Sequence, residues 1–134
     1  MQTFKLTPKP ESDFRLEINE IRKTCRLEKT GYRHNKIVYG FCDALPDIAA
    51  LQAQGLNIEL IPFDARQLEL AQNLIERGRA KSKIEHLQRD LAENGANNEA
   101  AIAAAQQRLT DLNDTIQAAK DALGIAGTLR TLKF

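Results

Sequence analysis

The sequence predicts an α+β protein: a small antiparallel β-rich head with one short helix, followed by a long C-terminal antiparallel helical hairpin with coiled-coil packing. Three observations predict this class. The first 63 residues hold short strand-like segments bounded by Pro and Gly, no proline follows Pro62, and a heptad repeat fills residues 102–123. We expect a head over 1–63, a hairpin over 64–124 and a tail over 125–134 that returns to the head as an added strand.

The head begins with two segments of strand pattern. Phe4 and Leu6 alternate with polar neighbours until the first prolines interrupt. Three further apolar residues alternate with polar ones and predict a second strand: Phe14, Leu16 and Ile18. The apolar positions then move to odd numbers, which indicates a bulge near Asn19–Glu20 or a short break.

The rest of the head is predicted as a strand, a helix and a strand. Turn-forming residues occupy 29–35 and an apolar run follows at Ile37–Phe41, so 13–41 is predicted to form an antiparallel hairpin. Helical spacing over Asp43–Gln54, through Leu45, Ile48, Ala49 and Leu51, has Asp43 as a candidate cap. A strand over Leu56–Ile61 follows. This order allows a crossover connection between parallel neighbouring strands.

The long helices follow Asp64, which is a candidate N-cap. Helical pattern is predicted from Ala65 to about Glu93 and again over 98–123, with a break at 94–97 and an end at Gly124. The second helix carries the seam of a coiled coil: Ile102, Ala105, Leu109, Leu112, Ile116, Ala119 and Leu123.

Folding the chain at Gly95 pairs this seam with apolar residues of the first helix. The predicted pairs are Leu91 with Ile102, Leu87 with Ala105, Ile84 with Leu109, and Ala80 with Leu112. Arg77 and Asn73 interrupt the first helix's seam. A second apolar stripe in its first half is predicted to pack on the head: Leu68, Ala71, Ile75 and Gly78.

Composition narrows the class of function. Aromatic residues make up only 5% and Trp is absent, which disfavours surfaces built on aromatic anchors or base-stacking platforms. No segment resembles a signal peptide or a membrane span. The isolated Cys25 and Cys42 favour free thiols in a reducing compartment over a disulfide, and hence a cytoplasmic protein. Residues 1–41 hold nine Lys or Arg against five Asp or Glu, whereas residues 42–134 hold ten against thirteen, so the first third of the chain is the more basic part.

The sequence contains no motif typical of an active site. It lacks nucleotide-binding glycine loops, the nucleophile elbow and zinc-protease spacing. The one catalytic alternative is a nucleophilic pair formed by Cys25 or Cys42 with His34. The other interpretation is that His34 and His86 are surface histidines without a catalytic role. We therefore expect that the protein is not an enzyme and that it has no catalytic, cofactor-binding or metal-ligating residues.

Two surface segments are candidate interfaces. The densest basic segment contains four cations: Arg77, Arg79, Lys81 and Lys83. It is interpreted as a solvated helix segment, with Arg77 reaching Asp114, or as a nucleic-acid contact assisted by head residues Arg22, Lys23, Arg26, Lys29 and Arg33. Small residues beside the seam indicate a self-association flank, or simply high helix propensity: Ala100, Ala101, Ala103 and Ala104.

The sequence therefore predicts a binding protein. The leading hypothesis is a protein–protein interaction or assembly module acting through the hairpin, as an adaptor or structural subunit that forms a homodimer; a phage or accessory genome is the expected setting. The partner's identity is left open. The alternative is a nucleic-acid-associated protein that uses the basic head and the Arg77–Lys83 segment. No membrane partner is expected.

Overall fold

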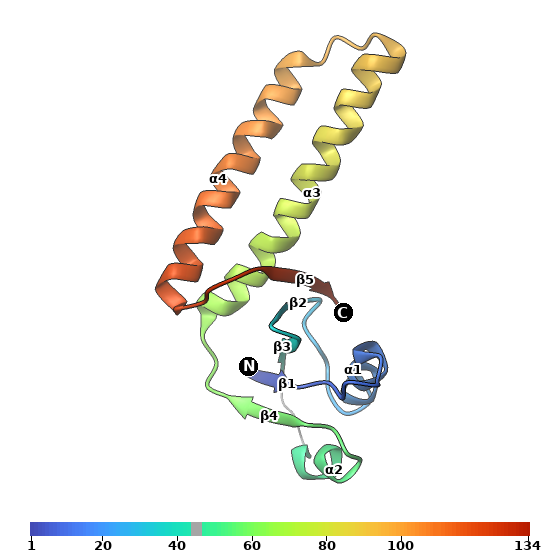
Figure 1. The fold of residues 1–134 in the computed structure, drawn as a ribbon, viewed down its shortest axis with the longest axis vertical. Helices are drawn as coiled ribbons and strands as arrows, with labels where there is room; N and C mark the ends of the chain where they lie inside the picture. The colour runs from blue at the N-terminus through green and yellow to red at the C-terminus, as the bar shows by residue number, and fades with distance from the viewer. Residues whose placement is uncertain (44–46) are drawn as a thin grey trace. The chain divides into compact units, whose positions relative to one another are not determined.

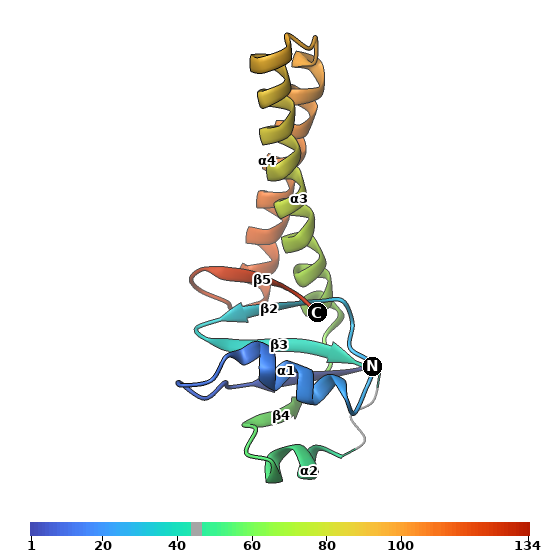
Figure 2. The same ribbon diagram turned by 90° about the vertical axis from the view of Figure 1, so that its right-hand side faces the viewer.

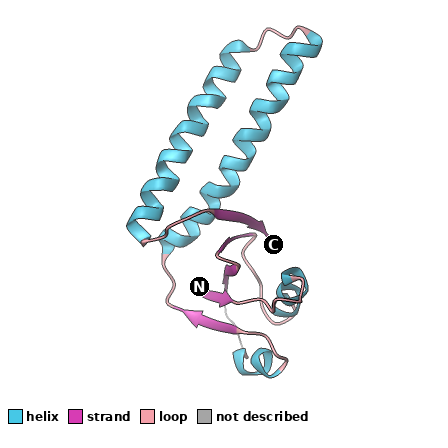
Figure 3. Cartoon of the chain, in the orientation of Figure 1, coloured by secondary structure: helices cyan, strands magenta, loops and turns pink. Residues whose placement is uncertain are grey.

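The chain folds into two compact units. The computed structural model describes residues 1–43 and 47–134. Residues 1–71 together with 127–134 form one unit, the head unit, and residues 72–126 form the other, the hairpin unit. The head unit contains both helices and strands, whereas the hairpin unit contains long helices (Figure 3).

The head unit is built on a five-stranded sheet in the order β4-β1-β3-β2-β5 (Figure 2). Every pair of neighbouring strands is antiparallel. The predicted fold class, an antiparallel sheet followed by a long helical hairpin, is confirmed. The strands are β1 (Gln2–Leu6), β2 (Thr30–His34), β3 (Ile37–Cys42), β4 (Ile58–Ile61) and β5 (Leu129–Lys133).

One face of the sheet carries the main core of the head unit. Alternate residues of β1, β3 and β4 point to this face, and helix α1 (Phe14–Arg22) contributes Ile18 and Ile21 to the same cluster. The Phe4 ring lies over Gly40 on the neighbouring strand, where a Cβ atom would collide with it. The opposite face is aromatic: Tyr32 stacks on Tyr39, and its hydroxyl accepts a hydrogen bond from Gln67 at 3.2 Å.

Helix α1 corrects the prediction of a second strand through Phe14, Leu16 and Ile18. The Asp13 side chain accepts a hydrogen bond from the Arg15 backbone N–H at 3.0 Å and caps the helix. Because Phe14, Ile18 and Ile21 follow helical spacing, they share one face, whereas Leu16 is 63% exposed. No bulge forms at Asn19–Glu20, because both residues lie inside the helix.

The predicted β-hairpin is shorter than expected. It consists of β2 and β3, which pair from Tyr32–Tyr39 to His34–Ile37. Asn35 and Lys36 form the two-residue turn, with φ angles of 52° and 66°, the left-handed conformation that such hairpin turns require. Much of the predicted turn over 29–35 is therefore strand β2.

Helix α2 (Ile48–Ala53) begins after Asp47, whose side chain accepts a hydrogen bond from the Ala50 N–H at 3.0 Å. The predicted cap at Asp43 is thus wrong, and Leu45 lies outside the described residues. The crossover from β3 through α2 to β4 does join parallel strands, but they are not neighbours. Strand β1 lies between them and pairs antiparallel with both.

The hairpin unit contains most of α3 (Ala65–Asn94) and all of α4 (Glu99–Leu123), as predicted from the heptad pattern (Figure 1). Asp64 accepts a hydrogen bond from the Arg66 N–H at 2.9 Å, so the predicted N-cap is confirmed. Gly124 ends α4 in the left-handed conformation, with φ 69°.

The register of the two helices differs from the prediction by about one heptad. The Asn98 side-chain amide donates to the Leu87 carbonyl oxygen at 2.9 Å, and Ala80 lines the same groove as Ala104 and Ala105. Ala80 therefore faces Ala105 rather than Leu112. The end of α3 lies beyond the start of α4 (Figure 1). A heptad repeat permits this displacement, because a shift of seven residues returns apolar side chains to apolar partners.

The displaced register explains the burial along the seam. Leu109, predicted to be buried against Ile84, is half-buried, whereas Leu112 and Ile116 are 7% and 2% exposed. In the observed register Leu109 is level with Arg77, the residue that interrupts the seam. Gly78, predicted to lie in a second apolar stripe, is exposed and has no neighbour near its Cβ position. Among the described residues, no helix is long and apolar enough to cross a membrane.

Candidate nucleic-acid interface

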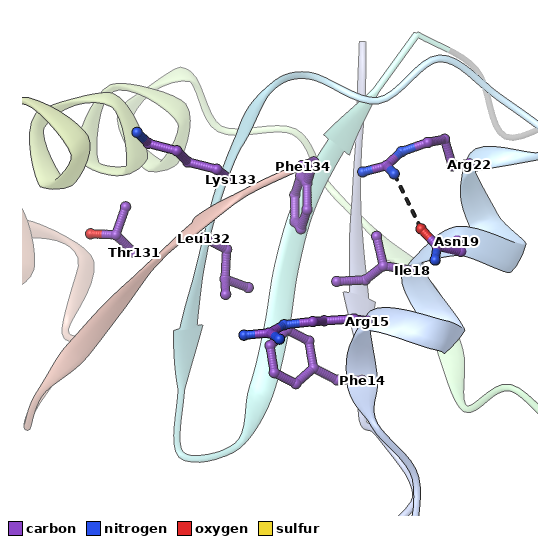
Figure 4. Close-up of a pocket in the computed structure, with 9 residues that line it drawn as sticks. All are labelled: Phe14, Arg15, Ile18, Asn19, Arg22, Thr131, Leu132, Lys133 and Phe134. Atoms are coloured by element: carbon purple, nitrogen blue, oxygen red, sulfur yellow. Dashed lines mark hydrogen bonds between the residues drawn. The ribbon is translucent and has the colours of Figure 1, made fainter.

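A groove lies on the core face of the head unit, between α1 and β5 (Figure 4). Its volume is about 500 Å³. Four apolar side chains line it: Phe14 and Ile18 from α1, with Leu132 and Phe134 from β5 and the residue that follows it. Two of the five phenylalanines in the chain are thus gathered in one groove, although aromatic residues are sparse overall.

The floor of the groove depends on a glycine. The Phe134 ring lies directly over Gly31 of β2, where a Cβ atom would come within 2.5 Å of both the ring and the Tyr39 carbonyl oxygen. The same ring lies 6.5 Å from the Phe4 ring, centroid to centroid. The end of the chain is therefore packed over the sheet beside the core of the head unit.

Helix α1 supplies cations along one wall. Arg15, Asn19 and Arg22 follow helical spacing and line the groove together. The Arg22 guanidinium donates to the Asn19 side-chain oxygen at 3.1 Å (Figure 4). Both arginines are exposed. The α1 wall therefore presents two positive charges above an apolar floor.

Strand β2 adds a third cation beside the groove. The Arg33 guanidinium lies 4.5 Å from the centroid of the Phe14 ring, a cation–π contact, and Arg15 lies 5.8 Å from the same centroid. Arg33 is paired across strands with Arg130 of β5. Residues paired directly across two strands point to the same side of a sheet, so these two arginines lie on the same face.

The arginines of this face have no carboxylate partners among the described residues. Within residues 1–43 and 47–134, none of the five ion pairs involves Arg15, Arg22, Arg33 or Arg130. Three other cations of the head unit are in ion pairs: Lys5 pairs with Glu59, Lys23 with Glu20, and Arg66 with Asp64. We refer to Arg15, Arg22, Arg33 and Arg130 as the basic face.

The basic segment predicted on α3 has a different environment. Arg79 contacts Glu76 at 2.6 Å, and Arg108 of α4 reaches the same carboxylate at 3.5 Å. The ion pair across the hairpin is therefore made by Arg108 and Glu76, rather than by Arg77 and Asp114. Arg77 is half-buried, whereas Arg79, Lys81 and Lys83 are exposed. Glu76 thus contacts one cation of this segment, Arg79, and one cation of α4, Arg108.

The alanine flank predicted on α4 is exposed along its length, at Ala100, Ala101, Ala103 and Ala104. Ala104 and Ala105 line a groove of about 380 Å³ between α3 and α4, whose rim carries Arg79, Lys83 and Arg108. The structure therefore brings part of the basic segment and part of the alanine flank together on one side of the hairpin unit.

Cys25 and Cys42 are free thiols, and Cys42 is fully buried. Burial, with the adjacent Cys25 thiol as a smaller cause, raises the pKa of the Cys42 thiol to about 12, so Cys42 is protonated at neutral pH. Among the described residues, no group of three or more His, Cys, Asp or Glu side chains is arranged to hold a metal ion.

Comparison of the chain with protein-family models, with curated proteins and with solved structures finds no significant match.

The sequence predicts Arg22 and Arg33 as head cations that assist nucleic-acid binding, but it does not single out Arg15 or Arg130. Arg15 was missed because residues 14–18 were interpreted as a strand; Asp13, followed by apolar residues at helical spacing, was the available signal for a helix. Arg130 is brought to Arg33 only by the pairing of β5 with β2, and no local pattern in the sequence predicts that pairing.

Proposed function

We propose that this protein is a non-catalytic, cytoplasmic nucleic-acid-binding protein whose basic face and adjoining groove hold a single strand. The observation that carries the proposal is the set of arginines without carboxylate partners beside an apolar groove. Single strands are bound by cations that track the phosphates and by apolar or aromatic surfaces that receive the bases. Arg15 and Arg22 supply the first element, and Phe14 and Phe134 supply the second.

Fluorescence anisotropy with a labelled single-stranded oligonucleotide tests this proposal. Arg15→Gln with Arg22→Gln is expected to weaken binding about tenfold or more and to reduce its salt dependence by about one to two released ions. The matched control is Lys23→Gln with Arg66→Gln, which removes the same charge from residues held in ion pairs. Equal affinities for both double variants, or no binding by the parent protein at low salt, would contradict the proposal.

A second function is favoured by the hairpin unit: self-association as an assembly module. The four exposed alanines of α4 permit close approach of another helix, and Leu87, Leu91 and Leu109 are half-buried rather than covered. A two-fold dimer with a four-helix arrangement would cover these leucines. Sedimentation of the full chain at micromolar concentration tests this. A monomer at every concentration, with amides of 72–126 protected from hydrogen exchange, would show that the hairpin is sufficient alone.

A further inference from the structure

A second cavity lies at the end of the basic face, where the β2–β3 turn meets the start of β5. Its volume is about 320 Å³, and five residues line it: Arg33, Asn35, Lys36, Thr128 and Arg130. All five side chains are polar, three are cationic and none is a carboxylate. This composition differs from that of the α1–β5 groove, which has an apolar floor.

Backbone structure brings these residues together from distant parts of the chain. Asn35 and Lys36 occupy the left-handed turn between β2 and β3, and Thr128 precedes β5. The β2–β5 ladder aligns Arg33 with Arg130. Cβ atoms of residues paired in this way lie about 4.5–5.5 Å apart, so the two arginines share one small region of the sheet.

This arrangement is unfavourable for the protein by itself. Like charges directly opposite each other on a sheet are destabilising. The Nε atom of Arg33 is buried and has no hydrogen-bond partner among the described residues. A buried donor without a partner costs free energy, and neither arginine is neutralised by a carboxylate. A bound anion would relieve the repulsion between the two arginines.

We propose that this cavity binds a phosphate group. Guanidinium groups bind phosphate oxygens with paired N–H donors, and the Lys36 ammonium, Asn35 amide and Thr128 hydroxyl supply further donors. Two sources share this chemistry: the terminal phosphate of a strand held in the α1–β5 groove, which rests on the proposed function, and free inorganic phosphate, which does not.

The first experiment uses the full chain and inorganic phosphate. Phosphate is expected to raise the melting temperature and to shift the amide resonances of Arg33, Lys36, Thr128 and Arg130. Arg130→Gln should weaken phosphate binding about tenfold or more, because it removes a charge-assisted contact. In phosphate-free, low-salt buffer the same variant should melt above the parent, because the cross-strand repulsion is gone. Lys5→Gln, a cation paired with Glu59, is the control.

The second experiment compares one oligonucleotide with a 5′-phosphate and with a 5′-hydroxyl. Tighter binding of the phosphorylated strand, lost in Arg130→Gln, identifies the strand terminus as the source. Phosphate binding with equal oligonucleotide affinities, or with no oligonucleotide binding, identifies free phosphate. If inorganic phosphate does not bind and the two strands bind equally, the cavity proposal is overturned while the proposed function stands. If neither phosphate nor strand binds, both are overturned.

Discussion

The basic face of the head unit and the basic segment of the hairpin unit contain similar numbers of cations in different surroundings. Along the sequence the hairpin segment is the denser, with four cations between Arg77 and Lys83. In space Glu76 contacts Arg79 of this segment and Arg108 of α4, and the groove beside them has no aromatic lining. The four arginines of the basic face have no carboxylate partner among the described residues, and two of them, Arg15 and Arg22, line a groove with Phe14 and Phe134. The density of charge in a sequence therefore does not predict which cations lie beside an aromatic groove on the folded surface.

The largest expected effect is on the stability of the hairpin unit and does not involve the basic face. Leu112→Asp should lower the free energy of unfolding by about 3 kcal/mol or more, because it places an unpaired charge in the seam. Leu109→Asp should lower the free energy of unfolding clearly less, because Leu109 is half-buried and lies level with Arg77 of α3. Chemical denaturation of both variants measures the difference. Equal losses would restore the register predicted from the sequence.

Reversing two charges in each basic region tests which region binds the oligonucleotide. Arg15→Glu with Arg22→Glu should reduce oligonucleotide affinity about a hundredfold, or about 2.7 kcal/mol, since two attractions become repulsions. Arg79→Glu with Lys83→Glu should change the affinity less than about threefold, because this segment already contains a carboxylate. Titrations at one fixed salt concentration decide between the regions. A larger loss in the hairpin variant would reverse our assignment.

The two units also differ in their expected response to alkali. Both groups whose pKa is raised to about 12, Tyr32 and Cys42, belong to the head unit. Burial is the main cause for each, so the folded state retains protons that the unfolded state releases. Their contribution to stability is present below the unfolded values of 10.0 and 9.0 and is lost as pH rises toward about 12.

Hydrogen exchange as a function of pH measures this difference. With exchange rates corrected for pH, amides of residues 1–71 should lose protection before those of 72–126 between about pH 9 and about pH 12. Tyr32→Phe should reduce the loss in the head unit, because it removes one of the two groups. Simultaneous loss of protection in both units would show that alkaline unfolding does not begin with these groups.

The smallest expected effect comes from removing the carboxylate that pairs with two cations of the hairpin unit. Glu76→Gln removes the carboxylate shared by Arg79 and Arg108 and keeps the shape of the side chain. Oligonucleotide affinity at low salt should rise by about twofold to threefold, because two exposed cations lose a weak competing partner. Anisotropy titration checks this. A decrease in affinity would mean that Glu76 positions a cation that contacts the strand.

Features set by a local sequence pattern could be predicted, whereas features set by the pairing of distant segments could not. Helices α3 and α4 were predictable because their apolar repeat extends over several heptads, although the same repeat is compatible with more than one register. Helix α1 was predicted wrongly, because Phe14, Leu16 and Ile18 also satisfy a strand pattern, although Asp13 before apolar residues at helical spacing is a signal for a helix. The 63% exposure of Leu16 in the structure shows that this residue faces outward. The basic face depends on the pairing of Arg33 with Arg130, which no local pattern determines.

The place of β5 in the sheet has a consequence for how the protein folds. Strand β5 pairs with β2, and the paired residues lie about a hundred positions apart in the chain. The hairpin of β2 and β3 and the antiparallel helices each form from contacts between nearby segments, which are rapid events. Closing the sheet with β5 requires a much longer loop, unless the helices have already paired and brought the ends of that loop together. We therefore expect the helical hairpin to form early and β5 to join the sheet last, so that the groove beside Phe134 appears only in the final folding step.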